Sequence, residues 1–251
     1  MLLAENITVK FGAFTAVDNV SLHVAPGELL GLAGTNGAGK STLFAAIAGQ
    51  MPLRSGRIVF DGVDITRQAV NKRAAHGLAR TFQVPREFAS LSVIDNLLAA
   101  APNERSETML AAWLLRGASA KRERAWIAHA DGVLELLNLS HLRNLSAAGL
   151  SGGQKKLLEL ARIMMREPKV VLLDEPFAGV NPVLIGEIVK ALRTLSVKGI
   201  ALVVVEHHLQ ALKSLVSRLV VMDQGRVLAQ GKPAEVLDSE AVKTAYMGGV
   251  V

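Results

Sequence analysis

The sequence predicts an α/β fold built around a mainly parallel sheet, and three observations lead to this prediction. Strand-like runs alternate with helical patterns, at residues 7–10, 29–33, 57–60, 170–174, 200–205, 219–223 and 226–230. The runs at 29–33, 170–174 and 200–205 are nearly all apolar, which is typical of parallel strands covered on both faces. The opening strand and the turn Asp223-Gln224-Gly225 indicate an antiparallel β edge.

Helical patterns replace strand patterns between residues 85 and 149, with helices expected at 92–101 and 121–137. We therefore predict one domain over residues 1–251, with residues 85–149 as an inserted α-helical subdomain. Two more helices are expected at 151–166 and 182–196. The apolar stripe of the 182–196 helix is explained by core packing and needs no functional role.

Composition restricts the class of protein. Half of the 251 residues are apolar, which allows a sizeable core, and the absence of cysteine excludes disulfides and thiolate metal sites.

The N-terminus lacks the basic flank of a signal peptide, and the longest aliphatic run, 200–205, is far shorter than the roughly 20 residues that span a bilayer. We expect a cytoplasmic protein. The net charge of +6 is compatible with a solvated surface, and aromatic residues make up only 4% of the chain, so no nucleic-acid partner is expected.

A glycine-rich motif, GTNGAGKS, follows the apolar run at 29–33 and precedes a helical segment at 42–48, which is the context that a P-loop requires. Its backbone N–H groups can surround phosphate oxygens, and the helix N-terminus adds partial positive charge. Lys40 can reach the β- and γ-phosphates, and Ser41 can offer its hydroxyl to Mg²⁺. A dinucleotide fingerprint fits less well, because Asn36 stands at the place of its second glycine. The nucleotide contacts predicted here are Gly34, Thr35, Asn36, Gly37, Ala38, Gly39, Lys40, Ser41 and Thr42.

Two other apolar strands end in residues suited to phosphate chemistry. The run 170–174 ends in Asp174 and continues with Glu175, and Pro176 stops the strand. Asp174 suits a Mg²⁺ ligand, and Glu175 could polarise the attacking water. The run 200–205 is followed by Glu206, His207 and His208. His207 is the candidate donor to the γ-phosphate, and His208 is interpreted as structural.

A second glycine turn, LSGGQ, precedes an amphipathic helix. Ser151 suits the N-cap, and Gly152 and Gly153 permit close backbone approach to an anion, with Gln154 following. An ordinary helix start is the alternative interpretation.

The motifs GTNGAGKST, TFQ, LSGGQ, VVLLDEP and EHH, in this order, resemble the nucleotide-binding subunit of an ABC transporter over nearly the whole chain. The segments ARTFQ, SVIDNLLAA and DEPFAGVNP, the VEH turn and the ending AYMG resemble the ATP-binding subunits of branched-chain amino acid importers more specifically. The resemblance implies a P-loop NTPase core that binds and hydrolyses ATP with Mg²⁺.

The resemblance also implies partners and further site residues. It implies a head-to-tail dimer of ATPase subunits, homomeric or heteromeric, in which the Ser151 turn of one subunit closes over the nucleotide held by Lys40 of the other. Phe11 matches the aromatic position that stacks on adenine, with core packing as the alternative. Gln83 matches a residue that senses Mg²⁺ and water. The helical subdomain would receive a short helix from transmembrane permease subunits, on the inner face of the cell membrane, and an extracytoplasmic solute-binding protein would act indirectly.

Three positions depart from the commonest ABC pattern, and several functions stay open. Thr35 stands where proline is usual, Asn181 replaces an aspartate, and His208 stands where the family often has aspartate. Thr35 should loosen the phosphate loop slightly. The expected function is an ATPase that drives import of branched-chain or other amino acids. The alternatives are the ATPase of a urea or amide importer, of a lipopolysaccharide exporter, or of a non-transport ABC protein.

Overall fold

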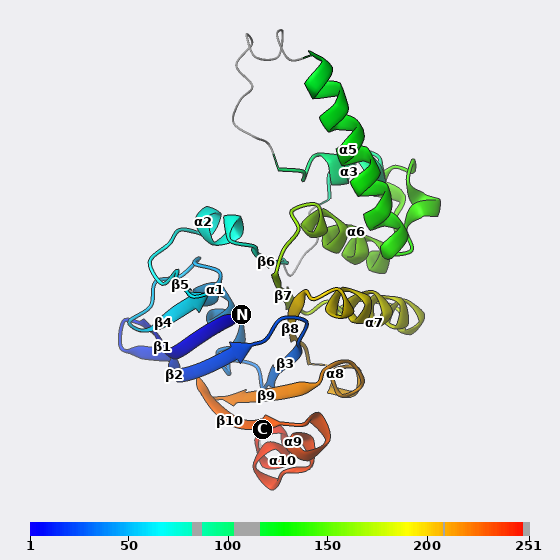
Figure 1. Ribbon diagram of the computed structural model, residues 1–251. Coiled ribbons are helices and arrows are strands. Elements are labelled where there is room, and N and C mark those ends of the chain that lie inside the picture. The colour runs from blue at the N-terminus through cyan, green and yellow to red at the C-terminus, as the bar shows by residue number, and fades with distance from the viewer. Residues whose placement is uncertain (82–86, 103–115, 208, 248–251) are drawn as a thin grey trace. The chain divides into compact units, whose positions relative to one another are not determined.

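The computed structural model describes residues 1–81, 87–102, 116–207 and 209–247 (Figure 1). The chain forms two compact units. The first contains residues 1–83, 168–178 and 192–251, and the second contains residues 84–167 and 179–191.

A six-stranded sheet in the first unit has the order β10-β9-β3-β8-β7-β6. Its strands are β3 (Leu29–Gly34), β6 (Leu78–Arg80), β7 (Val170–Asp174), β8 (Ala201–Val205), β9 (Arg218–Asp223) and β10 (Arg226–Gly231). All neighbours pair in parallel except β9 and β10, which form the predicted antiparallel edge. Every residue of β3, β7 and β8 is buried, as their apolar sequences predict.

A second, antiparallel sheet of four strands lies in the same unit, in the order β2-β1-β4-β5. It comprises β1 (Leu2–Phe11), β2 (Phe14–Val24), β4 (Ser55–Phe60) and β5 (Val63–Asp64). The opening strand therefore belongs to a separate sheet. The sequence pattern does not predict β2, whose apolar alternation is interrupted at Asn19, where φ is 53° and the pairing with β1 is irregular.

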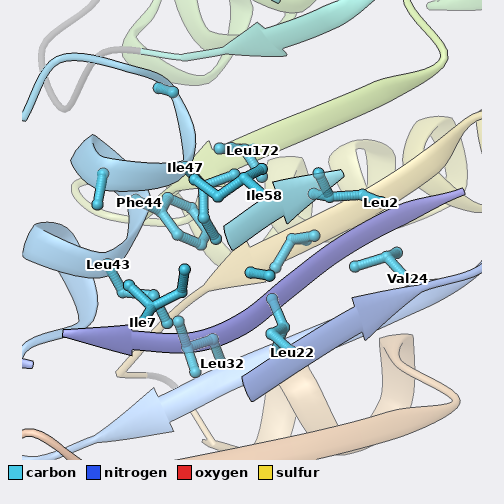
Figure 2. Packing of buried hydrophobic residues seen from close by; sticks show 14 of the residues in the cluster. Leu2, Ile7, Leu22, Val24, Leu32, Leu43, Phe44, Ile47, Ile58 and Leu172 are labelled. Carbon is cyan, nitrogen blue, oxygen red and sulfur yellow. The ribbon is translucent and has the colours of Figure 1, made fainter. Parts of the chain in front are cut away.

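The core of the first unit gathers side chains from both sheets around α1 (Lys40–Ile47), as Figure 2 shows. Leu43, Phe44 and Ile47 of α1 are fully buried. Complete burial of one such side chain stabilises a fold by about 1.5–3 kcal/mol. The helix that follows the phosphate loop is therefore anchored in the core along its length.

The second unit is helical. It contains α3 (Val93–Leu98), α5 (Arg116–Leu136), the short 3-10 helices η1 (Ser140–Leu142) and η2 (Ala147–Gly149), α6 (Gly152–Met164) and the first part of α7 (Pro182–Val197). α3 packs against both α5 and α6. The stretch 85–149, for which the sequence predicts an inserted helical subdomain, contains α3, α5, η1 and η2 in its described part.

Four short helices of the first unit are not predicted by the sequence pattern. These are α2 (Val70–Ala75), α8 (Leu209–Leu215), α9 (Pro233–Asp238) and α10 (Glu240–Met247). α9 contacts β9 and β10, and α10 contacts α9 and β10. Among the helices of the described residues, none is both long and apolar enough to cross a membrane.

Candidate nucleotide site

The phosphate loop connects the carboxyl end of β3 to the N-terminus of α1. Gly34, Gly37 and Gly39 have φ values of 145°, 80° and 94°, which other residues rarely adopt. A Cβ at Gly34 would also collide with the Met222 carbonyl oxygen. Gly39 is the N-cap of α1, and no side chain caps that end. The first N–H groups of the helix are therefore suited to an anion.

Lys40 lies across the loop. Its buried Nζ donates to the carbonyl oxygens of Gly34, at 2.9 Å, and Thr35, at 2.8 Å. Burial lowers the pKa of Lys40, while the negative charges of Glu175 and Asp174 act in the opposite direction. An ammonium group has three donors, so these two bonds leave one N–H for a phosphate oxygen. Ser41, the next residue, is exposed.

Asp174 ends β7 and is buried. Its Oδ2 accepts a hydrogen bond of 2.8 Å from Arg80 Nη2, and its backbone N–H donates to Thr81 Oγ1 at 3.0 Å. Arg80 is itself held by Gln50 Oε1, at 2.6 Å, and lies over the Phe44 ring. Arg80 is not among the residues predicted from the sequence. It ends the three-residue strand β6, which pairs with β7, and its charge is the one local feature that could have indicated a role.

Glu175 and His207 lie together where β7 and β8 end. Glu175 has a left-handed φ of 49°, and its N–H donates to the Val205 carbonyl at 2.9 Å. Its Oε1 is 3.0 Å from Nε2 of His207. The structure thus brings the predicted water-polarising carboxylate and the predicted phosphate donor into contact.

Glu206 is a second residue that sequence reasoning misses. It is buried, and its carboxylate accepts the backbone N–H groups of Phe177, at 2.6 Å, and His207, at 3.1 Å. These bonds tie the turn after β7 to the turn after β8. Glu206 therefore fixes the backbone that carries Glu175 and His207.

Phe11 lies at the tip of the β1–β2 hairpin. It is 51% exposed and stands opposite Phe14, which is 65% exposed. Exposure disfavours the core-packing alternative for Phe11. Ala16, two residues beyond Phe14, has its carbonyl oxygen against Gly39 of the phosphate loop. Phe14 is thus on the strand that touches the loop, and Phe11 ends the strand paired with it.

The Ser151 turn belongs to the second unit. Ser151 and Gln154 form a capping box, in which the Ser151 N–H donates to Gln154 Oε1 at 2.9 Å and the Gln154 N–H donates to Ser151 Oγ at 3.4 Å. A Cβ at Gly153 would collide with Leu184, so packing requires this glycine. Ser151 and Gly152 are exposed, and they are the residues of the turn most accessible to an anion.

The other predicted site residues differ in exposure, and two of them cannot be located. Gln83 and His208 lie outside the described residues. Asn36 and Gly37 form the exposed tip of the phosphate loop, Ala38 is buried, and Thr42 is half-buried. Asn181 accepts the Val183 N–H at 2.8 Å at the start of α7, which explains it as a helix cap.

The residues present fit a magnesium ion that arrives with a nucleotide. Ser41 offers an exposed hydroxyl, and Asp174 offers a carboxylate of which Arg80 engages one oxygen. Mg²⁺ keeps several waters and is bound by few protein ligands together with phosphates. The described residues contain no cluster of three or more His, Cys, Asp or Glu side chains that could hold a metal, so they provide no separate metal cage.

A glycine loop between a parallel strand and a helix, with carboxylates at the end of another strand of the same sheet, defines a P-loop nucleotide-hydrolysing fold. The family model for ABC transporters matches residues 17–178, and the model for branched-chain amino acid ATP-binding cassette transporters matches residues 226–251. The chain therefore belongs to the ABC transporter family. It is an ATP-binding subunit that hydrolyses ATP to drive transport.

Similar proteins support the same family over the whole chain. A probable branched-chain amino acid transport ATP-binding protein of Methanocaldococcus jannaschii is 36% identical over 99% of this chain and 97% of its own length. A high-affinity branched-chain amino acid transport ATP-binding protein of Pseudomonas aeruginosa is 34% identical, with coverage of 99% and 98%. The lipopolysaccharide export ATP-binding protein of Haemophilus influenzae is also 34% identical, with coverage of 99% and 97%.

A solved ATP-binding cassette of an ABC transporter, in its ADP conformation, superposes with a TM-score of 0.86 at 36% identity, covering 99% of this chain and 98% of that one. A nucleotide-free cassette from an ABC transporter gives a TM-score of 0.85 at 35% identity, with coverage of 98% of both chains. These structures confirm the predicted fold class.

Proposed function

We propose that this chain energises an importer of branched-chain or other amino acids. The observation that carries its chemistry is the contact between Glu175 and His207 at the carboxyl ends of β7 and β8, the next two strands on one side of β3. The proposed cargo is supported by the C-terminal match at 226–251 and by the relatives named as branched-chain amino acid transport proteins. Lipopolysaccharide export is the alternative that a similar relative favours, and import of urea or amides remains a further one.

Different residues have different roles in the proposed hydrolysis of ATP. Lys40, the loop N–H groups and the start of α1 hold the β- and γ-phosphates, and Phe11 stacks on adenine. Ser41 and Asp174, with Gln83 as a third candidate, would hold Mg²⁺, and the bound ion would supply positive charge against the phosphates. Glu175 orients the attacking water. In the tautomer that carries its proton on Nε2, His207 donates to Glu175 in this structure. When ATP is bound, the same N–H donates to the γ-phosphate instead, and Glu175 then accepts from the attacking water.

The Ser151 turn implies a second ATPase subunit. Its exposed serine and glycine begin a helix, as the phosphate loop does. We infer that Ser151, Gly152, Gly153 and Gln154 of one subunit contact the nucleotide held by the other. Charge-assisted hydrogen bonds across the interface contribute about 1.5–3 kcal/mol each. ADP lacks the γ-phosphate, so the closed dimer depends on ATP.

A group of exposed apolar side chains in the second unit suits the permease. Phe88, Leu91 and Leu145 are exposed, and backbone hydrogen bonds from Ala147 and Ala148 to residues 91 and 89 place the two short segments side by side. We infer that permease subunits dock here, which places the chain peripherally on the cytoplasmic face of the membrane. An extracytoplasmic solute-binding protein would deliver the cargo to the permease.

Replacing Glu175 with Gln tests the chemistry. We expect turnover to fall by about 100-fold or more, because the amide cannot accept a proton from water, while Mg-ATP affinity stays near that of the unmodified protein. Lys40→Ala should instead weaken binding itself. Phosphate release and equilibrium binding of a fluorescent ATP analogue separate the two effects. Hydrolysis at the normal rate by Glu175→Gln protein would remove Glu175 from the mechanism.

The unmodified protein and the Glu175→Gln variant also test which solute is transported. Each is reconstituted with the membrane subunits that co-purify with the chain. ATP-driven uptake of labelled leucine that stops with Glu175→Gln supports the importer. Uptake of urea, or outward movement of lipopolysaccharide without leucine transport, would instead establish one of the alternatives.

A further inference from the structure

We propose that the C-terminal part of the chain holds the phosphate loop in the conformation that binds nucleotide. The positioning contact is the hydrogen bond between Thr35 and Asp223. The proposal rests on nucleotide binding at this loop. We call Met222, Asp223, Gly225 and Tyr246 the C-terminal clamp. Each of these residues contacts the segment from Gly34 to Gly39.

The first contacts are hydrogen bonds on either side of the loop tip. Thr35 Oγ1 donates to Asp223 Oδ1 at 3.3 Å, and both residues are partly buried. The Gly225 N–H donates to the Ala38 carbonyl at 3.2 Å. Between these two points lie the exposed residues Asn36 and Gly37. The β9–β10 turn therefore holds the loop before and after its tip.

Close backbone packing supports the same clamp. Gly34 is paired in parallel with Met222, and the Met222 carbonyl oxygen occupies the space that a Cβ at Gly34 would need. A Cβ at Gly39 would lie 3.5 Å from the Gly225 Cα, an ordinary van der Waals contact, and Gly225 has a φ of 80° in the turn. The shape of the turn and the shape of the loop thus depend on each other.

Tyr246 of α10 provides a contact from farther along the chain. Its hydroxyl is buried near the Gly34 amide, and it makes no hydrogen bond of regular geometry with the described residues. Burial raises the pKa of the phenol, and the Gly34 N–H acts in the opposite direction. The last described helix therefore reaches the first residue of the loop.

Thr35 explains why such a clamp matters in this chain. A proline at this position fixes its own φ, whereas threonine leaves the backbone more freedom. The hydroxyl bond to Asp223 restores part of that restraint from outside the loop. A loop already held in its binding shape loses less conformational entropy when it binds a triphosphate, and so binds it more tightly.

Thr35→Val removes the donor and keeps the shape of the side chain. We expect it to weaken binding of a fluorescent ATP analogue by about 3- to 10-fold, the effect of one lost hydrogen bond. Thr35→Ser keeps the hydroxyl and should bind like the unmodified protein. Thr35→Pro fixes φ and should recover most of the loss. In the Asp223→Ala protein, the rate constant of hydrolysis at saturating ATP should change little, because Asp223 is not one of the predicted nucleotide contacts.

A double-mutant cycle with Asp223→Ala isolates the contact. The Asp223 substitution should weaken binding in the Thr35 protein and have little further effect after Thr35→Val or Thr35→Pro. Normal affinity of the Thr35→Val protein, or effects of the two substitutions that simply add, would overturn the clamp. Absence of nucleotide binding in the unmodified protein would instead contradict the proposed function. Because Thr35→Val and Thr35→Ser differ mainly in the hydroxyl, their comparison stands even if Asp223→Ala lowers the melting temperature.

Discussion

Arg80 places a cation against the carboxylate that the sequence assigns to magnesium. A buried carboxylate requires partners, and Asp174 has one in Arg80 at 2.8 Å. Gln50 and the Phe44 ring hold the guanidinium from its other sides. The orientation of Asp174 is therefore set by protein groups before a metal arrives, and we infer that Arg80 is a positioning residue for Mg²⁺ binding.

Arg80→Ala tests this inference through the dependence of nucleotide affinity on Mg²⁺. We expect the gain in affinity that Mg²⁺ gives to shrink by about 10-fold, since one charge-assisted contact is lost. Affinity without Mg²⁺ should stay nearly constant, and Arg80→Lys should be intermediate. Arg57→Ala, which removes an exposed ion pair with Glu5, is the matched control. An unchanged response to Mg²⁺ in the Arg80→Ala protein would rule out the positioning role.

Elements differ in how much of them the sequence reveals. β3, β7 and β8 are predictable because full burial on both faces requires an unbroken apolar run. β2 is not, because its irregular pairing disrupts the alternation. The strand-end residues Asp174, Glu175 and His207 follow from the motifs, whereas Arg80 meets Asp174 only through the pairing of β6 with β7, between residues 94 positions apart. Long-range pairing of this kind leaves no local pattern.

The C-terminus of α1 depends on another element in a similar way. Arg73 of α2 is buried and donates to the carbonyl oxygens of Ala46 and Ile47, at 2.9 and 2.6 Å, as well as to those of Thr66 and Gln68. It donates to two carbonyls at the end of α1, of which that of Ala46 also accepts the Gly49 N–H at 3.1 Å. The burial that accompanies these bonds lowers the pKa of Arg73. The helix behind the phosphate loop is thus capped from α2.

Arg73→Met is expected to destabilise the protein by about 2 kcal/mol or more, because two buried and two partly buried carbonyls lose a donor. The midpoint of urea unfolding measures the loss. Lys72→Met removes a neighbouring charge that is exposed, and it should leave the midpoint nearly unchanged. Equal shifts for the two variants would show that charge alone, and not capping of α1, accounts for the effect.

At the scale of the whole molecule, two helix starts suited to anions occupy two compact units. The phosphate loop lies in the first unit, where Lys40, the loop amides and the start of α1 are the groups that we expect to hold a triphosphate. The Ser151 turn lies in the second unit. Helix capping accounts for the presence of Ser151 and Gln154, but it does not account for the exposed Gly152. We propose that these two helix starts act on one nucleotide shared by two chains.

Mixing two inactive variants tests this claim most directly. Lys40→Ala protein lacks the phosphate lysine, and Ser151→Arg protein blocks the second turn. In a mixed dimer with shared sites, one site combines an intact Lys40 with an intact Ser151, so random pairing in a two-fold dimer should restore roughly a quarter of normal ATP hydrolysis. If each chain holds a complete site of its own, the mixture contains no intact copy. No recovery of hydrolysis, with mixed dimers demonstrated by capture through differently tagged chains, would contradict the shared site.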